Sequence, residues 1–201
     1  MGEPGLRERK KKETSARLWR AALDLFAERG FDAVSTAEIA AAADVSKMTL
    51  FNYFPTKEDL ILMPVEDHID EPARVVRARP DGQSAIEALR TQFLAALAAR
   101  DPATGLSDSE PVMLMQRLAR STPSLLARAL HYELTRANTL ADALAEPGPT
   151  TPFDHVRARQ IMGVISALVE HNVARVLAGD KPDAVYPEAV TLAERGFDLL
   201  E

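Results

Sequence analysis

The stretch STAEIAAAADVSKMTLFNYFPTKE, residues 35–58, carries the start and stop signals of two short helices. Ser35 and Glu38 have the spacing of a capping box, in which each side chain accepts a hydrogen bond from the other residue's main chain. Ser46 can cap a second helix over residues 47–53, and Pro55 ends it because proline cannot continue the hydrogen-bond ladder. Two short helices so close together predict a compact helical motif.

The turn between these helices is Ala43-Asp44-Val45. Asp44 is a residue type that adopts left-handed backbone angles more readily than most non-glycine residues. A turn of this length between two short helices predicts a helix-turn-helix.

A third helix precedes this pair and completes the motif. Its apolar residues recur at helical spacing: Leu18, Ala22, Leu25 and Phe26. The helix is predicted to end at Gly30, with Phe31 packing back against it. Within residues 47–54, Leu50 and Phe54 lie four positions apart and are expected to be buried against Phe26 and Ile39.

The remaining chain also reads as helical, since β-branched alternation is missing. Thr56 opens a longer helix in which Pro64 and Pro72 should produce bends, and Pro80-Asp81-Gly82 is the expected linker. Further helices are predicted from the capping box Ser84 to Glu87 through Leu97, and over 111–120, 123–145, 152–178 and 187–200. The predicted fold class is all-α, organised as a basic arm (1–12) that can be disordered without DNA, a helix-turn-helix domain (13–56), a connecting helix (57–80) and a helical effector-binding and dimerisation domain (81–201).

Composition excludes several classes of protein. The 201 residues are 46% hydrophobic and 27% charged, and they include no cysteine, which removes disulfides, thiolate metal sites and cysteine nucleophiles. The polar start does not resemble a secretory signal, and no apolar run approaches the roughly 20 residues of a membrane span. We therefore expect a cytoplasmic protein without membrane association.

Charge is distributed unevenly along the chain. Residues 1–20 carry seven Lys and Arg against three Glu, whereas residues 61–201 carry fourteen basic and twenty acidic groups. A polyanion should therefore meet the N-terminal part and be repelled by the rest. A basic terminus alone is weak evidence for nucleic-acid binding, because most such segments are merely solvated.

Residues 25–31, 35–40 and 45–58 together resemble the DNA-binding domain of bacterial TetR/AcrR-type transcriptional regulators, over a match of roughly Leu18 to Leu62. The resemblance implies a ligand-responsive regulator, by default a repressor, that binds a palindromic operator in double-stranded DNA as a homodimer. It also implies that a small effector releases the protein from DNA. Beyond residue 62 the chain resembles the family only in being helical and of suitable length.

The helix over 47–53 would be the recognition helix, since an α-helix fits the major groove of B-DNA. By resemblance, Thr49 and Phe51 would face bases, Lys47 and Met48 would lie at the end that enters the groove, and Tyr53 and Lys57 would contact phosphate. The full set of candidate DNA contacts is Thr36, Lys47, Met48, Thr49, Phe51, Asn52, Tyr53 and Lys57. Two alternatives stay open: Phe51 can belong to the core, and Met48 can be a loosely packed surface residue.

The last two helices carry more apolar surface than one neighbour would cover, and the family pairs its last two helices across a dimer. The expected interface comprises Ile161, Ile165, Leu168, Val176, Val190 and Phe197. The alternative is that these residues form an intramolecular core.

An apolar effector cavity is expected among the middle helices, by resemblance. Its candidate lining is His68, Phe93, Leu97, Met113, Leu114, Arg117, His131, Tyr132, Gln160, Met162 and His171. Each of these can instead be ordinary core or a surface histidine.

Two other classes of function fit the sequence less well. An enzyme is disfavoured, because the chain has no GxSxG, no glycine-rich phosphate loop, no HExxH and only four scattered histidines. No cofactor and no metal are expected. A helical interaction module without a DNA role would leave residues 47–57 unexplained.

Overall fold

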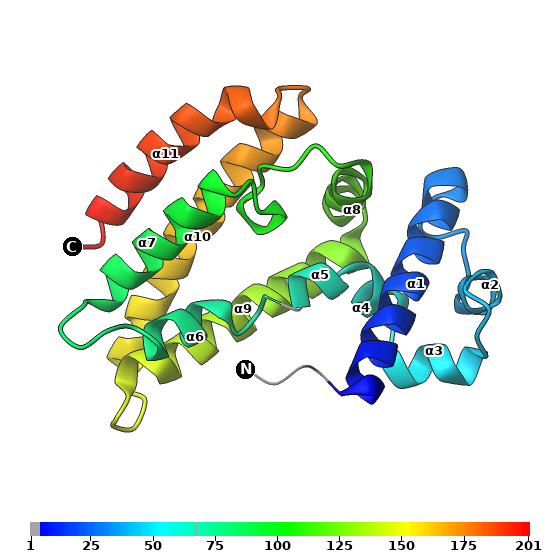
Figure 1. The fold of residues 1–201 in the computed structure, drawn as a ribbon, viewed down its shortest axis with the longest axis horizontal. Helices are drawn as coiled ribbons and strands as arrows, with labels where there is room; N and C mark the ends of the chain where they lie inside the picture. Colours follow the sequence, from blue (N-terminus) through cyan, green and yellow to red (C-terminus); the bar gives the residue numbers. More distant parts are fainter. Residues whose placement is uncertain (1–4, 67) are drawn as a thin grey trace. The chain divides into compact units, whose positions relative to one another are not determined.

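The computed structural model describes residues 5–66 and 68–201, and these residues form helices and connecting loops without a strand (Figure 1). The all-α prediction is therefore confirmed. The chain divides into two compact units: the first comprises the chain up to Glu66 together with Leu114–Arg128, and the second comprises residues 67–113 and 129–201.

The first unit contains α1 (Leu6–Arg29), α2 (Thr36–Ala42), α3 (Lys47–Tyr53), α4 (Lys57–Ile61) and α5 (Met63–Glu66). Helix α1 packs against α2 and α4, and α2 packs against α3. The C-terminal part of α8 (Glu110–Ser121) and the first turns of α9 (Pro123–Ala145) also belong to this unit. Two helices of the chain thus contribute residues to both units.

Helix α1 begins earlier than the sequence analysis expected. Residues 6–12, assigned there to an arm, are helical and continuous with the remainder of α1. Lys, Arg and Glu are good helix formers, so a run of these residues extends a helix that is already nucleated. Residues 1–4 of the expected arm and the side chains of residues 6–8 lie outside the described part.

The single bent helix expected after Thr56 is instead three separate short helices, α4, α5 and α6 (Glu71–Arg77). Pro64 is the second residue of α5, and Pro72 is the second residue of α6. Proline fits the first turn of a helix but cannot donate to a preceding turn, so each proline begins a new helix rather than bending an old one.

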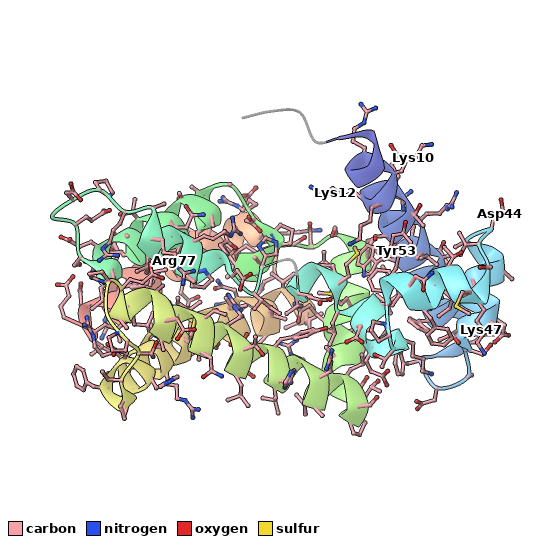
Figure 2. The ribbon with its side chains drawn as sticks, turned by 90° about the horizontal axis from the view of Figure 1, so that it is seen from below. Lys10, Lys12, Asp44, Lys47, Tyr53 and Arg77 are labelled. Carbon is pink, nitrogen blue, oxygen red and sulfur yellow. The ribbon has the colours of Figure 1, made fainter. Side chains whose placement is uncertain are left out.

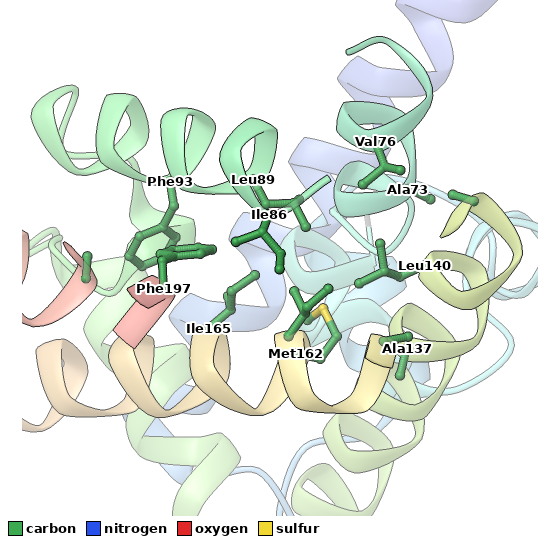
Figure 3. Close-up of a cluster of buried hydrophobic side chains, with 14 of the residues drawn as sticks. Ala73, Val76, Ile86, Leu89, Phe93, Ala137, Leu140, Met162, Ile165 and Phe197 are labelled. Atoms are coloured by element: carbon green, nitrogen blue, oxygen red, sulfur yellow. The ribbon is translucent and has the colours of Figure 1, made fainter. Parts of the chain in front are cut away.

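The second unit contains α6, α7 (Ala85–Ala98), the 3₁₀ turn η1 (Pro102–Thr104), α10 (Pro152–Leu177) and α11 (Pro182–Asp198), with the rest of α8 and α9. Helix α11 packs against both α7 and α10, and α6 packs against α7. Phe93 of α7 and Phe197 of α11 meet with ring centroids 6.0 Å apart, and Leu89, Met162 and Ile165 belong to the same buried cluster (Figure 3).

This core corrects most of the expected dimer interface. Ile161, Ile165, Val176 and Phe197 are each at most 7% exposed within one chain, so the core of the same chain already covers them. Leu168 and Val190 are half-buried and pack against the same core. The intramolecular alternative holds for these residues, because α7 covers the apolar surface that the sequence left without a partner.

The loop after η1 approaches α10 closely. A Cβ at Gly105, whose φ is 81°, would lie 2.7 Å from the Val169 carbonyl oxygen and 2.8 Å from the Val173 side chain. Buried Asn172 donates to the Thr104 carbonyl beside it, at 2.8 Å. Only glycine fits this position.

Among the helices that the structure describes, none combines the length and the apolar character required to cross a bilayer.

Candidate functional site

The turn of the helix-turn-helix has the predicted conformation. Asp44 has a φ of 51°, and the amide of Val45 donates to the Ala40 carbonyl at 2.9 Å. Ser35 and Glu38 form the complete capping box of α2, and the Ser46 hydroxyl accepts from the amide of Thr49 at the start of α3. The predicted caps and turn are confirmed, and together they fix the direction of α3.

Helix α3 has one buried face and one exposed face. Leu50 is fully buried and Phe54 is 5% exposed, as predicted, and Phe26 and Ile39 are buried as well. Met48 is 71% exposed and Phe51 is 40% exposed. The alternative that Phe51 belongs to the core is therefore not supported.

The other candidate DNA contacts of α2 and α3 vary in exposure. Lys47 and Asn52 are exposed, whereas Thr36, Thr49 and Tyr53 are half-buried. The Thr49 hydroxyl lies 2.8 Å from the Ser46 hydroxyl, and the Lys47 ammonium lies 5.6 Å from the centre of the Phe51 ring. The surface of α3 thus offers a methionine, an aromatic ring, an amide and a cation, with no carboxylate of its own.

Glu38 of α2 is an acid whose pKa is strongly shifted. Its pKa is lowered to about 2, first by the hydrogen bond from the Ser35 amide, then by the Ser35 hydroxyl and by Arg29. Arg29 of α1 donates to Glu38 at 2.8 Å. The capping box is therefore anionic at every physiological pH, and its charge is paired.

Lys57 has internal partners that sequence reasoning missed. Its ammonium donates to the carbonyl oxygens of Phe31 at 2.8 Å and Val34 at 3.3 Å, and it lies 4.2 Å from the centre of the Phe31 ring. The side chain joins the start of α4 to the loop after α1. The expected phosphate contact would compete with these bonds.

A buried ion pair holds α4 against α9. Asp59 is 3% exposed, and its Oδ1 lies 2.6 Å from both Nε and Nη2 of Arg128. Its Oδ2 accepts from the Thr56 hydroxyl and amide in the α4 capping box. The Trp19 indole donates to the Ile61 carbonyl at 3.1 Å, which joins α1 to α4. No local pattern in the sequence indicates this ion pair, because Arg128 lies 69 residues from Asp59.

The two units differ in net charge. The first unit carries thirteen Lys and Arg against eleven Asp and Glu, and the second carries eleven against nineteen. Lys10 and Lys12 lie on the first turns of α1, and Lys47 and Tyr53 lie on α3 of the same unit (Figure 2). The unit that bears the helix-turn-helix is the one that can attract a polyanion.

The second unit contains a pocket of about 500 Å³, including its open mouth. Apolar walls come from α6, α7 and α10, and polar groups come from α6, α7, α9 and the η1 segment. The lining residues are Glu71, Pro72, Val75, Leu89, Gln92, Phe93, Ala96, Asp101, Ala103, Thr104, Arg136 and Ile165.

Phe93 is the one expected lining residue that the structure places at this pocket. Leu97, Met162 and Tyr132 are buried elsewhere, and Arg117, His131 and Gln160 are exposed. Met113, Leu114, His68 and His171 are half-buried, but Leu114 and Arg117 belong to the first unit. The expected set already combined apolar and polar residues, but the polar residues that line the pocket are others: Glu71, Gln92, Asp101, Thr104 and Arg136.

His68 acts on the pocket indirectly. Its Nδ1 lies 2.7 Å from Glu71 Oε2, and this hydrogen bond raises the pKa of His68 and lowers the pKa of Glu71. Asp101 adds a smaller Coulombic contribution that also raises the pKa of His68. A titratable pair thus stands beside the pocket.

A capped helix-turn-helix with an exposed second helix defines a DNA-binding transcriptional regulator of the helix-turn-helix class. Residues 18–62 match the family model described as bacterial regulatory proteins, tetR family. The chain is 32% identical over 166 residues to the HTH-type transcriptional regulator TcmR of Streptomyces glaucescens, and the alignment covers 82% of this chain and 74% of TcmR. The protein belongs to the TetR family.

Solved structures share the fold. NalD, the secondary repressor of the MexAB-OprM multidrug efflux pump in Pseudomonas aeruginosa, superposes with a TM-score of 0.58 at 19% identity, covering 92% of this chain and 97% of that one. Thermus thermophilus FadR, a TetR-family transcriptional repressor in complex with lauroyl-CoA, gives a TM-score of 0.51 at 23% identity, covering 92% of each chain. At these identities the likeness concerns the fold alone.

Proposed function

We propose that this protein is a ligand-responsive repressor that binds a palindromic operator as a homodimer and is released by a small, mainly apolar effector. The observation that carries the proposal is the two-faced α3: Leu50 and Phe54 anchor it, while Met48 and Phe51 project from the other side. Thymine methyl groups in the major groove can contact apolar side chains exposed on such a helix. This role places the protein in the cytoplasm with the DNA.

Helix α3 enters the major groove in this proposal. Thr49 and Phe51 contact base edges, Lys47 and Met48 lie at the end that enters first, Asn52 can bond a base, and Tyr53 contacts phosphate. Thr36 of α2 adds a hydroxyl contact. Lys57 contacts phosphate only if its bonds to the Phe31 and Val34 carbonyls are shared or released.

A dimer is required because one helix-turn-helix reads too few base pairs to select an operator. We place the interface on the outward face of α10, where small exposed residues lie seven, four and seven positions apart: Val156, Gly163, Ala167 and Ala174. Leu199 at the end of α11 is 83% exposed. Small residues let two helices approach closely, and a two-fold axis would pair the face with its own copy.

The assignment of functions to segments follows from these sites. Residues 13–56 bind DNA, residues 57–80 connect, and residues 81–201 dimerise and bind the effector, together with Glu71, Pro72 and Val75 of the connecting segment. The pocket in the second unit is the effector site. FadR, bound to lauroyl-CoA, supports a small-molecule site in a protein of this fold.

The test is selection of bound fragments from genomic DNA by the purified protein, followed by affinity measurements at two salt concentrations. We expect a palindromic optimum and a linear fall of log affinity with log salt, with a slope of about 0.9 per phosphate neutralised. Thr49→Ala should change which sequence is preferred, whereas Tyr53→Phe should weaken binding on every sequence. Thr91→Ala, an exposed threonine of α7, is the matched control.

Binding that is insensitive to salt, or a sequence preference that Thr49→Ala and Phe51→Ala both leave unchanged, would contradict the proposal. A helical interaction module without a DNA role would retain no DNA fragments in the selection.

A further inference from the structure

The first turns of α1 project beyond the packed part of the first unit. Residues 9–13 are all exposed, although they cover every side of the helix, and the first buried side chain described in α1 is Leu18. A helical segment without a buried side gains no stability from packing of its own. These turns are held in place because they continue a helix that packs against α2 and α4.

The sign of the charge changes along α1. Residues 9–20 carry six Lys and Arg against one Glu, whereas residues 21–30 carry one Arg against Asp24 and Glu28. Among the described residues, none of the six cations forms an ion pair, while Arg29 near the end of the helix is paired with Glu38. The uncompensated positive charge lies at the start of the helix, so a polyanion is attracted to that end.

The projecting turns and α3 lie at one edge of the first unit. Figure 1 shows the first turns of α1 level with α3, and Figure 2 views that edge with Lys12, Lys47 and Tyr53 on it. From this edge the remainder of α1 leads away from α3. Arg17 and Arg20 lie five and eight residues beyond Lys12, about 8 and 12 Å along the helix axis at 1.5 Å per residue.

The shape of the major groove decides what the projecting turns would meet on DNA. The groove is about 8.5 Å deep, so the phosphates on either side of a helix in the groove stand above the base edges that the helix contacts. An element level with α3 at the same edge therefore meets phosphate before it can reach a base. Lysine suits such a contact, because its ammonium group is a point charge on a long, flexible side chain.

We propose that residues 9–12 of α1 form a second DNA contact, which binds the phosphate backbone beside the groove occupied by α3 and reads no bases. The inference rests on the proposed function, in which α3 lies in the major groove. These cations are carried by a helix anchored in the packed unit, so they need not be ordered on binding as a flexible arm would be. The contact adds affinity and salt dependence and leaves the choice of operator to α3.

The test measures the affinity of the full chain for an operator fragment selected by the wild type, at several salt concentrations. Lys10→Gln with Lys12→Gln removes two cations of the proposed contact, and glutamine keeps a similar helix propensity. The slope of log affinity against log salt should lose about 0.9 for each phosphate contact removed, or about 1.8 per protomer. The preferred sequence should stay the same.

Arg17→Gln with Arg20→Gln is the matched control, because it removes the same charge from exposed positions of the same helix. Its slope should change by less than about half as much, since charges more than about 8 Å from a phosphate are screened at physiological salt. Lys10→Arg with Lys12→Arg keeps both charges and should retain the wild-type slope. All three variants should have the urea midpoint of the wild type, because the substituted side chains are exposed.

An unchanged slope in Lys10→Gln with Lys12→Gln would overturn the second contact, and so would an equal loss in the Arg17 and Arg20 control. A changed sequence preference would overturn the assignment to phosphate. A wild type without salt-dependent, sequence-selective DNA binding would refute the proposed function. Operator binding that Thr49→Ala alters, but that Lys10→Gln with Lys12→Gln leaves intact, would refute the second contact alone.

Discussion

Lys57 shows why a cation in a DNA-binding motif is hard to assign from sequence. The resemblance implies a phosphate contact, and the position of Lys57 in the first turn of α4 agrees with it. The two carbonyl oxygens that the ammonium reaches belong to residues 31 and 34, in the loop that follows Gly30. Main-chain acceptors leave no signature in a sequence, so this internal role becomes visible only in the fold.

We expect Lys57→Met to lower the free energy of unfolding by about 1 to 2 kcal/mol, because two charge-assisted hydrogen bonds and a cation–π contact are lost. Lys47→Met, at an exposed position of α3, should change it by less than about 0.5 kcal/mol. Urea unfolding of both variants measures the difference. Unchanged stability of Lys57→Met together with weaker DNA binding would restore the phosphate contact as the main role of Lys57.

His68 should make the stability of the protein depend on pH. Its pKa is raised, first by the hydrogen bond with Glu71, so the folded state binds the proton more tightly than the unfolded state. The resulting stability is present in full below the ordinary histidine value of 6.5 and is lost as pH rises through the raised pKa. The urea midpoint of His68→Gln should therefore fall below that of the wild type at pH 6, with a smaller difference at pH 9. Glu71→Gln should give the same pattern, and a constant difference for both variants would exclude the pair as its source.

The predicted helix boundaries agree with the structure where local capping residues determine them. The capping boxes at Ser35, Thr56 and Ser84 are all present, because the hydrogen bonds of a cap involve residues only three positions apart. Prediction was poorer where the alternatives have similar energy, as with the start of α1 and the separation of α4, α5 and α6. A proline fits either a bend or a new first turn, and the surrounding packing selects between them.

The contact between α4 and α9 should depend on the Asp59–Arg128 pair. Arg128→Met leaves a carboxylate that is 3% exposed without its main counter-charge, and we expect a loss of about 2 kcal/mol in unfolding free energy. Combined with Asp59→Asn, a double-mutant cycle should give a coupling of about 1 to 3 kcal/mol. Arg120→Met, which loses only a bond within α8, is the control. Additive effects of the two substitutions would show that the pair contributes little.

For the whole molecule, the sequence could not tell what covers the apolar faces of α10 and α11. An apolar stripe states that a helix face is covered, but it does not state whether the cover is the same chain or a second copy. Ile161, Ile165 and Phe197 face α7 and one another, whereas Val156 and Ala167 remain outside. The charged lining residues of the pocket could not be predicted from the apolar pattern either, because they do not contribute to it.

The oligomeric state should respond to the outward face of α10. Val156→Glu places a charge on a side chain that is 52% exposed in one chain, and we expect light scattering to report monomers, because burial of that carboxylate in a two-fold interface is unfavourable. Met48→Glu, at 71% exposure in the first unit, should remain dimeric. Dimers of unchanged strength in Val156→Glu would remove α10 from the interface.

Helix α9 carries both Arg128, which belongs to the first unit, and Arg136, which lines the pocket of the second. Eight residues separate them along one unbroken helix, a rise of about 12 Å at 1.5 Å per residue. Both guanidinium groups therefore belong to the same helix. In the proposed function, an effector that binds beside Arg136 would contact the helix whose Arg128 pairs with Asp59.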